Sequence, residues 1–213
     1  MTLDYHPRSL NLTEFVKPEM SPLAILGYFF IPVIGVIYGS YQFSGLKRFG
    51  LERKERYSFV WFLMCGLIHC VLEGFYVANH NVIQGTKGLL ADIWKEYAKS
   101  DSRYLTRDPN VLAIEILTAA VIGPLCFICA WYILKRKSRQ YTLQMFISTS
   151  QLYGVLIYYM GAGFDEFIYC SPKPLHFWGY FFGTNAFWVV MPIIMLRNAA
   201  AAINSRFQKI KSN

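Results

Sequence analysis

Three ionisable side chains stand inside apolar stretches of this chain of 213 residues. His69 and Glu73 lie near the middle of residues 58–78, and Glu115 lies within residues 110–134. An ionisable group at the centre of a membrane helix costs on the order of 3 kcal/mol, and it usually faces the protein interior and marks a functional site. Because positions i and i+4 share one face of a helix, His69 and Glu73 can hydrogen-bond to each other. The pattern predicts a buried site that transfers protons.

Further polar residues recur on helix faces in the apolar stretches. Thr118 follows Glu115 by three positions, and Asn185 precedes Trp188 by the same spacing. A third stretch has a polar face with steps of three, four and seven positions, formed by Gln144, Ser148, Gln151 and Tyr158. A lone Asn, Gln or Thr in a membrane helix more often joins two helices than contacts a ligand. Both explanations stay open for these residues.

The composition is that of a polytopic membrane protein. Hydrophobic residues make up 54% of the chain and charged residues only 16%, which indicates one membrane domain over residues 1–213. Residues 1–20 contain no apolar signal-peptide region, so we expect the first span to act as its own insertion signal. Five stretches have about the 20 residues that a bilayer core requires. They are residues 22–43, 58–78, 110–134, 142–160 and 177–196.

The net charge of +8 is distributed asymmetrically. With five spans, residues 45–57, residues 135–141 and the basic tail 197–213 fall on one side of the membrane and hold most of the basic residues. This asymmetry predicts a cytosolic carboxyl terminus and a lumenal amino terminus, and it argues against nucleic-acid binding. Lys209 and Lys211 near the end resemble a dilysine retrieval signal for the endoplasmic reticulum.

The long connection between the second and third spans carries its own pattern. Residues 89–99 have apolar side chains at helical spacing, which predicts an amphipathic helix in the lumenal interface with Trp94 and Tyr97 at headgroup level. Asp101, Arg103 and Tyr104 follow at once. This cluster is either a solvated turn or a polar lid that captures a ligand hydroxyl over the membrane site.

The sequence contains neither a metal-ligand set nor a cofactor motif that we can identify, so we expect no cofactor and no metal. The cysteines lie mostly inside apolar stretches and read as buried, inert thiols. Carboxylates and aromatic rings in a dry pocket suit proton transfer to a hydrophobic substrate, where they can stabilise a cation. The residues alone therefore indicate either a proton-transfer enzyme of the lipid phase or a receptor for lipophilic amines.

Five runs in order closely resemble the emopamil-binding protein family of EXPERA-type membrane proteins. The runs are Cys65–Gly74, Trp94–Tyr104, Glu115–Thr118, Gln151–Gly154 and Asn185–Trp188. The resemblance implies an all-α bundle of five membrane helices in the endoplasmic reticulum, with 3β-hydroxysteroid delta8–delta7 isomerase activity. It also implies a sterol substrate, lipophilic cationic amines as inhibitors and contact with membrane lipids. We also allow for a homodimer.

The resemblance assigns roles to individual residues. It places His69, Glu73 and Glu115 as the catalytic groups that protonate C9 of the 8(9) alkene and remove a C7 proton. Thr118, Asn185 and Trp188 line the same site, where Trp188 would face the carbocation and the other two would orient the acids. The expected sterol contacts also include Trp94, Tyr97, Asp101, Arg103, Tyr104, Gln151 and Tyr158. A non-catalytic lipid or amine binder, and an isomerase for another steroid or triterpenoid, remain alternatives.

Overall fold

The computed structural model describes residues 4–211, apart from the side chains of residues 209 and 210. All regular secondary structure in this part of the chain is helical, and three of the long helical runs contain or begin with a π-helical segment, in which the turn is wider than in an α-helix. The elements are α1 (Pro22–Ser44), α2 (Arg53–Leu67), η1 (Ile68–Glu73), α3 (Gly74–Asn79), α4 (Leu89–Tyr97), α5 (Arg103–Thr106), α6 (Pro109–Leu117), η2 (Thr118–Ile122), α7 (Gly123–Leu134), α8 (Arg139–Phe164), η3 (Leu175–Thr184) and α9 (Asn185–Lys211).

Four helical runs of the described chain are long and apolar enough to cross a membrane. They are Pro22–Ser44, Arg53–Asn79, Pro109–Leu134 and Leu175–Gln208, which contain four of the five expected spans. The protein is therefore an all-helical membrane protein. The expected span at residues 142–160 lies inside α8, a helix of 26 residues that is less apolar than the other four.

Local chemistry explains where two of these runs begin. The hydroxyl of Ser21 accepts a hydrogen bond from the backbone N–H of Ala24 at 3.3 Å, and Pro22 occupies the first position of α1. Asp108 accepts from the N–H of Val111 at 2.9 Å, and Pro109 follows it. A side-chain oxygen satisfies an N–H that has no partner in the first helical turn, and proline has no such N–H to satisfy.

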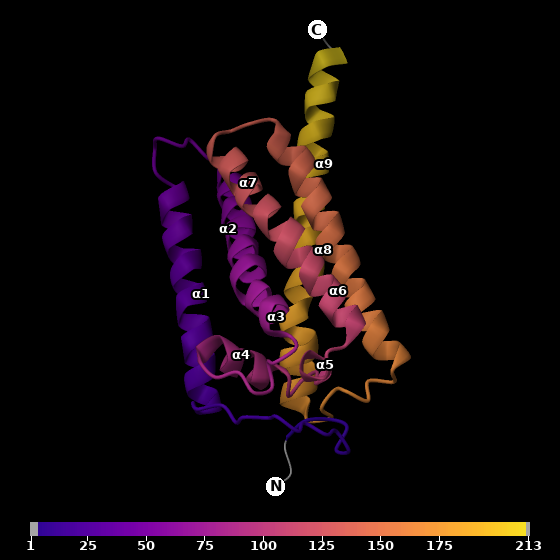
Figure 1. The fold of residues 1–213 in the computed structure, drawn as a ribbon. Coiled ribbons are helices and arrows are strands. Elements are labelled where there is room, and N and C mark those ends of the chain that lie inside the picture. The colour runs from indigo at the N-terminus through magenta and orange to yellow at the C-terminus, as the bar shows by residue number, and fades with distance from the viewer. Residues whose placement is uncertain (1–3, 212–213) are drawn as a thin grey trace.

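The long runs stand side by side (Figure 1). α8 packs along α9, α2 packs along α7, and α1 packs against α2 at the edge of the bundle. Most of α1 is exposed, including Leu23, Ile31 and Tyr38. In a bilayer these apolar side chains contact lipid, so their exposure is consistent with a membrane-spanning helix rather than a defect of packing.

The short helices α4 and α5 close the end of the bundle near the amino terminus (Figure 1). Helix α4 packs against α1 and α3, and it buries both apolar and charged residues. The ammonium of Lys95 donates to the carbonyls of Val16 at 2.7 Å and Thr86 at 2.6 Å, which ties the amino-terminal segment to this end. Burial lowers the pKa of Lys95.

Trp94 is only 5% exposed, so its ring packs inside the protein.

The basic segment after residue 196 is helical as far as it is described. α9 continues through Lys211 without a break and extends beyond the other helices (Figure 1). The last two residues of the predicted retrieval signal, at positions 212 and 213, lie outside the described part of the chain.

Candidate functional site

The predicted pairing of His69 with Glu73 is present. The Nδ1 atom of His69 lies 2.7 Å from Oε2 of Glu73, and His69 is 1% exposed. Both residues belong to η1, where the expected α-helix widens to a π-helix. Such π-helical turns occur mostly inside α-helices and often at functional sites. The spacing of four residues therefore predicted the contact, but it gave no sign of the change in helix type.

Gln151 of α8 contacts the other side of the imidazole. Its Nε2 atom lies 3.1 Å from Nε2 of His69. An amide nitrogen can only donate, so Nε2 of His69 accepts and Nδ1 carries the proton that points at Glu73. Gln151 is 3% exposed and thus holds the ring from a helix far away in sequence. Imidazole orientation by a second partner is typical of catalytic histidines.

The hydroxyl of Thr118 lies between the side chain of Glu73 and the backbone of Glu115. Its hydroxyl hydrogen-bonds to Oε2 of Glu73, and the same oxygen lies 3.1 Å from the backbone carbonyl of Glu115. Thr118 begins η2, the second π-helical turn, which packs against η1. Both ionisable segments therefore meet where each helix departs from α-helical geometry.

Glu115 has a partner that the sequence did not reveal. The phenolic hydroxyl of Tyr104 donates to Oε1 of Glu115 at 2.6 Å, and both residues are buried. Tyr104 lies in α5, beyond the end of the membrane helices, and its ring stacks on Trp94 with ring centres 4.8 Å apart. Burial raises the pKa of Tyr104 well above its ordinary value, so the hydroxyl stays protonated and remains a donor.

Gly123 brings η1 and η2 together. A Cβ atom at this position would lie 2.5 Å from Sγ of Cys70 and 3.0 Å from Cβ of His69. Both distances are shorter than van der Waals contact, so only glycine fits without a shift of η1. Gly123 was not among the residues that sequence reasoning singled out, because a glycine in an apolar helix gives no sign of its neighbour.

Trp188 of α9 lies beside the imidazole. Its ring centre is 6.1 Å from that of His69 and 6.0 Å from that of Trp61. Asn185, one turn earlier, donates to the hydroxyl of Tyr97 at 2.8 Å and to the carbonyl of Phe181 at 2.7 Å. Asn185 is therefore placed to orient Tyr97. The hydrogen bonds of its amide in the described part of the chain do not include either glutamate, which the resemblance implied it would orient.

The cluster after α4 is buried, so it is not a solvated turn. Asp101 and Arg103 are 0% and 1% exposed, and they form a bidentate pair with Nη2 to Oδ2 at 2.7 Å and Nε to Oδ1 at 3.0 Å. Tyr158 donates to Oδ2 of Asp101 at 2.7 Å. Burial alone would lower the pKa of Arg103, but its hydrogen bonds to Asp101 raise it. The pair holds α5 against α8 and so holds Tyr104 over Glu115.

Several buried polar atoms near His69 have no hydrogen-bond partner in the described part of the chain. They are Oε2 of Glu115, Nε1 of Trp188, Oε1 of Gln151 and Oγ of Ser148. An unpaired buried polar atom costs about 1–3 kcal/mol. These atoms leave donors and acceptors available to a bound molecule. Among the described residues, no group of three His, Cys, Asp or Glu is arranged to hold a metal ion.

Fold and site together define a helical membrane protein whose transmembrane segments enclose two carboxyls and one imidazole. Glu73 is hydrogen-bonded to His69, and Glu115 is hydrogen-bonded to Tyr104. The EXPERA (expanded EBP superfamily) family model matches residues 89–199, and relatives over 30% identical cover nearly the whole chain. The chain belongs to this family, as the resemblance implied.

Individual relatives carry functional names. A probable 3-beta-hydroxysteroid-Delta(8),Delta(7)-isomerase from Oryza sativa is 33% identical over 211 residues, which cover 98% of this chain and 96% of the relative. The 3-beta-hydroxysteroid-Delta(8),Delta(7)-isomerase of Rattus norvegicus is 32% identical, with 98% and 94% covered. An isomeliandiol synthase from Melia azedarach is 34% identical, with 80% and 79% covered.

Proposed function

We propose that the protein is a sterol isomerase that moves a delta8(9) double bond to delta7 through protonation and a carbocation. Two observations carry the proposal. The first is the hydrogen-bonded group of His69, Glu73 and Thr118, whose Thr118 hydroxyl also contacts the backbone carbonyl of Glu115. The second is the isomerase names of relatives over nearly the full chain. This group contains what the reaction requires, namely a proton donor and a proton acceptor in a water-poor site.

Hydrogen bonding distinguishes the two carboxyls. Glu73 accepts from both His69 and Thr118 through Oε2, which suits a carboxylate. Glu115 accepts from Tyr104 through Oε1, while Oε2 is unpaired and can carry a proton toward the substrate. We therefore assign Glu115 as the acid and Glu73, supported by His69, as the base.

The reaction balances with these two groups. Glu115 gives its proton to C9, the electrons of the double bond form the new C9–H bond, and C8 becomes a tertiary carbocation. Glu73 then takes a proton from C7, and the C7–H electrons form the 7(8) double bond. Trp188 presents an aromatic ring near the cation, and such rings stabilise a desolvated positive charge by about 2 kcal/mol. Transfer of this proton from Glu73 back to Glu115 restores the acid and the base.

We infer that five helices span the membrane, with α8 as the fifth. At 1.5 Å per residue its 26 residues extend about 39 Å, enough for a hydrocarbon core of about 30 Å. Five spans with the basic segments on one side place the amino terminus in the lumen and α9's end in the cytosol. α4 and α5 would then cover the lumenal end of a single domain in the endoplasmic reticulum.

A triterpenoid substrate is the second candidate. The isomeliandiol synthase from Melia azedarach and a protoglabretal synthase from Citrus sinensis are 34% and 33% identical to this chain. A triterpenoid isomerisation would use the same acid, base and cation stabilisation, so the catalytic group does not distinguish the two substrates. A carboxylate pair near an aromatic ring would also bind lipophilic ammonium ions, because they imitate the cation.

The test supplies the purified protein with a delta8 sterol in deuterated water and analyses the product by mass spectrometry and NMR. We expect the delta7 sterol with one deuterium at C9, because the acid exchanges with solvent before it donates. A product without deuterium at C9 would contradict the protonation mechanism. No product from the sterol, but turnover of a triterpenoid, would favour the second candidate, and failure with both would favour a non-catalytic binder.

A further inference from the structure

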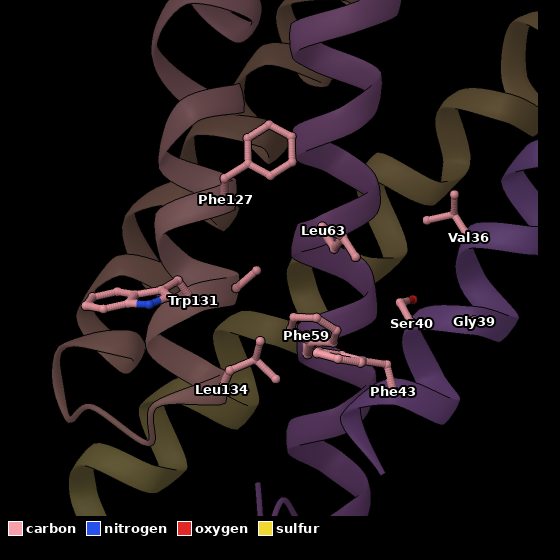
Figure 2. Close-up of a pocket in the computed structure, with 10 residues that line it drawn as sticks. Val36, Gly39, Ser40, Phe43, Phe59, Leu63, Phe127, Trp131 and Leu134 are labelled. Atoms are coloured by element: carbon pink, nitrogen blue, oxygen red, sulfur yellow. The ribbon is translucent and has the colours of Figure 1, made fainter. Parts of the chain in front are cut away.

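An open apolar groove lies away from the site, between α1, α2 and α7. It has a volume of about 490 Å³, within the usual range of about 300–1,000 Å³ for ligand sites. Figure 2 shows the side chains of the three helices around it. The lining residues are Val36, Gly39, Ser40, Phe43, Phe59, Leu63, Phe127, Ala130, Trp131 and Leu134. The hydroxyl of Ser40 donates to the carbonyl of Ile37 at 3.2 Å, so this polar group of the lining is hydrogen-bonded within its own helix.

One end of the groove carries arginine side chains. The guanidinium carbon of Arg48 lies 5.3 Å from the ring centre of Phe43, which lines the groove. Arg136 follows the lining residue Leu134 by two positions, and its Nη1 lies 3.4 Å from where a Cβ atom of Gly50 would stand. Both arginines therefore lie where α7 and the α1–α2 loop meet the mouth of the groove.

These arginines are not neutralised by the protein. Both are exposed, and neither forms an ion pair with a carboxylate in the described part of the chain. Glu55, which lies in the same region, uses its carboxylate to accept from the backbone N–H of Glu52 at the start of α2. Glu52 and Glu55 are the two acidic residues of residues 45–57 and 135–139, where basic residues outnumber them, so this end of the groove carries a net positive charge.

The position of the groove limits what can occupy it. Its walls belong to three helical runs that can cross a membrane, so its opening faces the hydrocarbon of the bilayer. Its charged end lies at the helix termini, at the depth of phosphate groups. An apolar slot with guanidinium groups at one end matches an acyl chain joined to a phosphate, which arginine binds through a fork of N–H donors. A sterol is neutral and would leave the arginines without a counter-charge.

We propose that this groove binds an anionic glycerophospholipid, with one acyl chain between α1 and α7 and the headgroup phosphate against Arg48 and Arg136. The lipid would hold α1 to α2 and α7. The proposal does not depend on isomerase activity, because its test measures bound lipid only.

The test uses the purified full-length protein, stripped of lipid in detergent and titrated with phosphatidylinositol or phosphatidylcholine of identical acyl chains, with native mass spectrometry as readout. We expect one tightly held phosphatidylinositol per chain and weaker retention of phosphatidylcholine. The double variant Arg48→Gln/Arg136→Gln should weaken phosphatidylinositol binding about thirtyfold, because each basic residue near an anionic lipid changes affinity roughly fivefold. Its matched control is Arg197→Gln/Arg206→Gln on α9, which removes the same charge elsewhere and should change little.

A second variant tests the acyl-chain part. A side chain at Gly39 has no atom within 4 Å of its Cβ, so Gly39→Leu should fold normally while it fills the groove, and it should displace both lipids. Gly27→Leu is the control, since this residue of α1 is equally unhindered but does not line the groove. Gel filtration and circular dichroism verify folding of every variant.

Three results would overturn the proposal. The first is equal retention of the two phospholipids by the wild-type protein. The second is undiminished phosphatidylinositol binding by the double arginine variant. The third is lipid retention by a folded Gly39→Leu protein, or a change in that variant from dimer to monomer, which would identify the groove as a contact between copies of the chain.

Discussion

At the scale of the residue, the hydrogen bonds around the two carboxyls assign them different tasks. Glu73 receives two donors on one oxygen, whereas Glu115 receives one and keeps its second oxygen unpaired. Two carboxyl groups in one site commonly act as acid and base because their different surroundings give them different proton affinities. The assignment can be tested one residue at a time.

We expect Glu73→Gln and Glu115→Gln each to lower turnover of the delta8 sterol at least about a hundredfold, the lower range for a general acid or base. Glutamine preserves the shape of the side chain but cannot complete a proton-transfer cycle. Turnover is followed by mass spectrometry of the sterols, with exposed Glu166→Gln as the matched control. Near-normal isomerisation by either variant would remove that carboxyl from the mechanism.

The two variants should also differ from each other. If Glu73 is the base, removal of the C7 proton limits the residual turnover of Glu73→Gln, so a substrate deuterated at C7 should react more slowly with this variant. Protonation at C9 limits Glu115→Gln, so deuterated water should slow this variant and the C7 label should not. The opposite pattern would exchange the two assignments.

At the scale of the element, the site depends on close approach of η1 and η2 at Gly123. We expect Gly123→Ala to lower turnover, because the new methyl group forces Sγ of Cys70 and Cβ of His69 away. Gly154→Ala is a mild control, since the nearest atom to its Cβ lies at 4.0 Å. Removal of the closest obstacle in Gly123→Ala/Cys70→Ala should restore part of the activity. No rescue, with the single variant folded, would show that His69 and not Cys70 limits the approach.

The buried pair of Asp101 and Arg103 should carry stability for the covering helices. Asp101→Asn leaves the guanidinium buried beside a neutral group, and such a loss costs about 3–5 kcal/mol. We expect a large fall in the thermal unfolding temperature in detergent. The apolar double variant Asp101→Leu/Arg103→Met should lose less than Asp101→Asn, because it leaves no unpaired charge behind. Equal falls in the unfolding temperature of the two variants would show that the charges of the pair do not contribute and that only its packing does.

At the scale of the whole molecule, the distribution of basic residues predicts the orientation in the membrane. We expect protease added to sealed microsomes to remove a tag at the carboxyl terminus and to spare one at the amino terminus, because basic loops stay in the cytosol. Permeabilised microsomes serve as the control, in which both tags should be removed. The reverse protection would place α4 and α5 on the cytosolic side, and equal protection of both tags would indicate an even number of spans.

The sequence alone determined the features that depend on local order. Apolar runs with lengths set by the bilayer predicted the four membrane-spanning candidates and a helix over residues 142–160. The spacing of His69 and Glu73 predicted their contact, since residues four apart on a helix are neighbours whatever surrounds them. Asp108 and Ser21 mark helix starts through contacts three residues away.

Only the tertiary structure decided which distant groups meet. Tyr104 hydrogen-bonds to Glu115, Gln151 hydrogen-bonds to His69, and Gly123 leaves space for the side chain of Cys70. Each contact depends on how two helices pack, and the spacing of residues within one helix carries no information about that. The sequence left Asp101 and Arg103 as either a solvated turn or a polar lid, and packing removed them from water and paired them. The residue types thus indicated the chemistry of the site, whereas helix packing determined the arrangement in which these residues can act together.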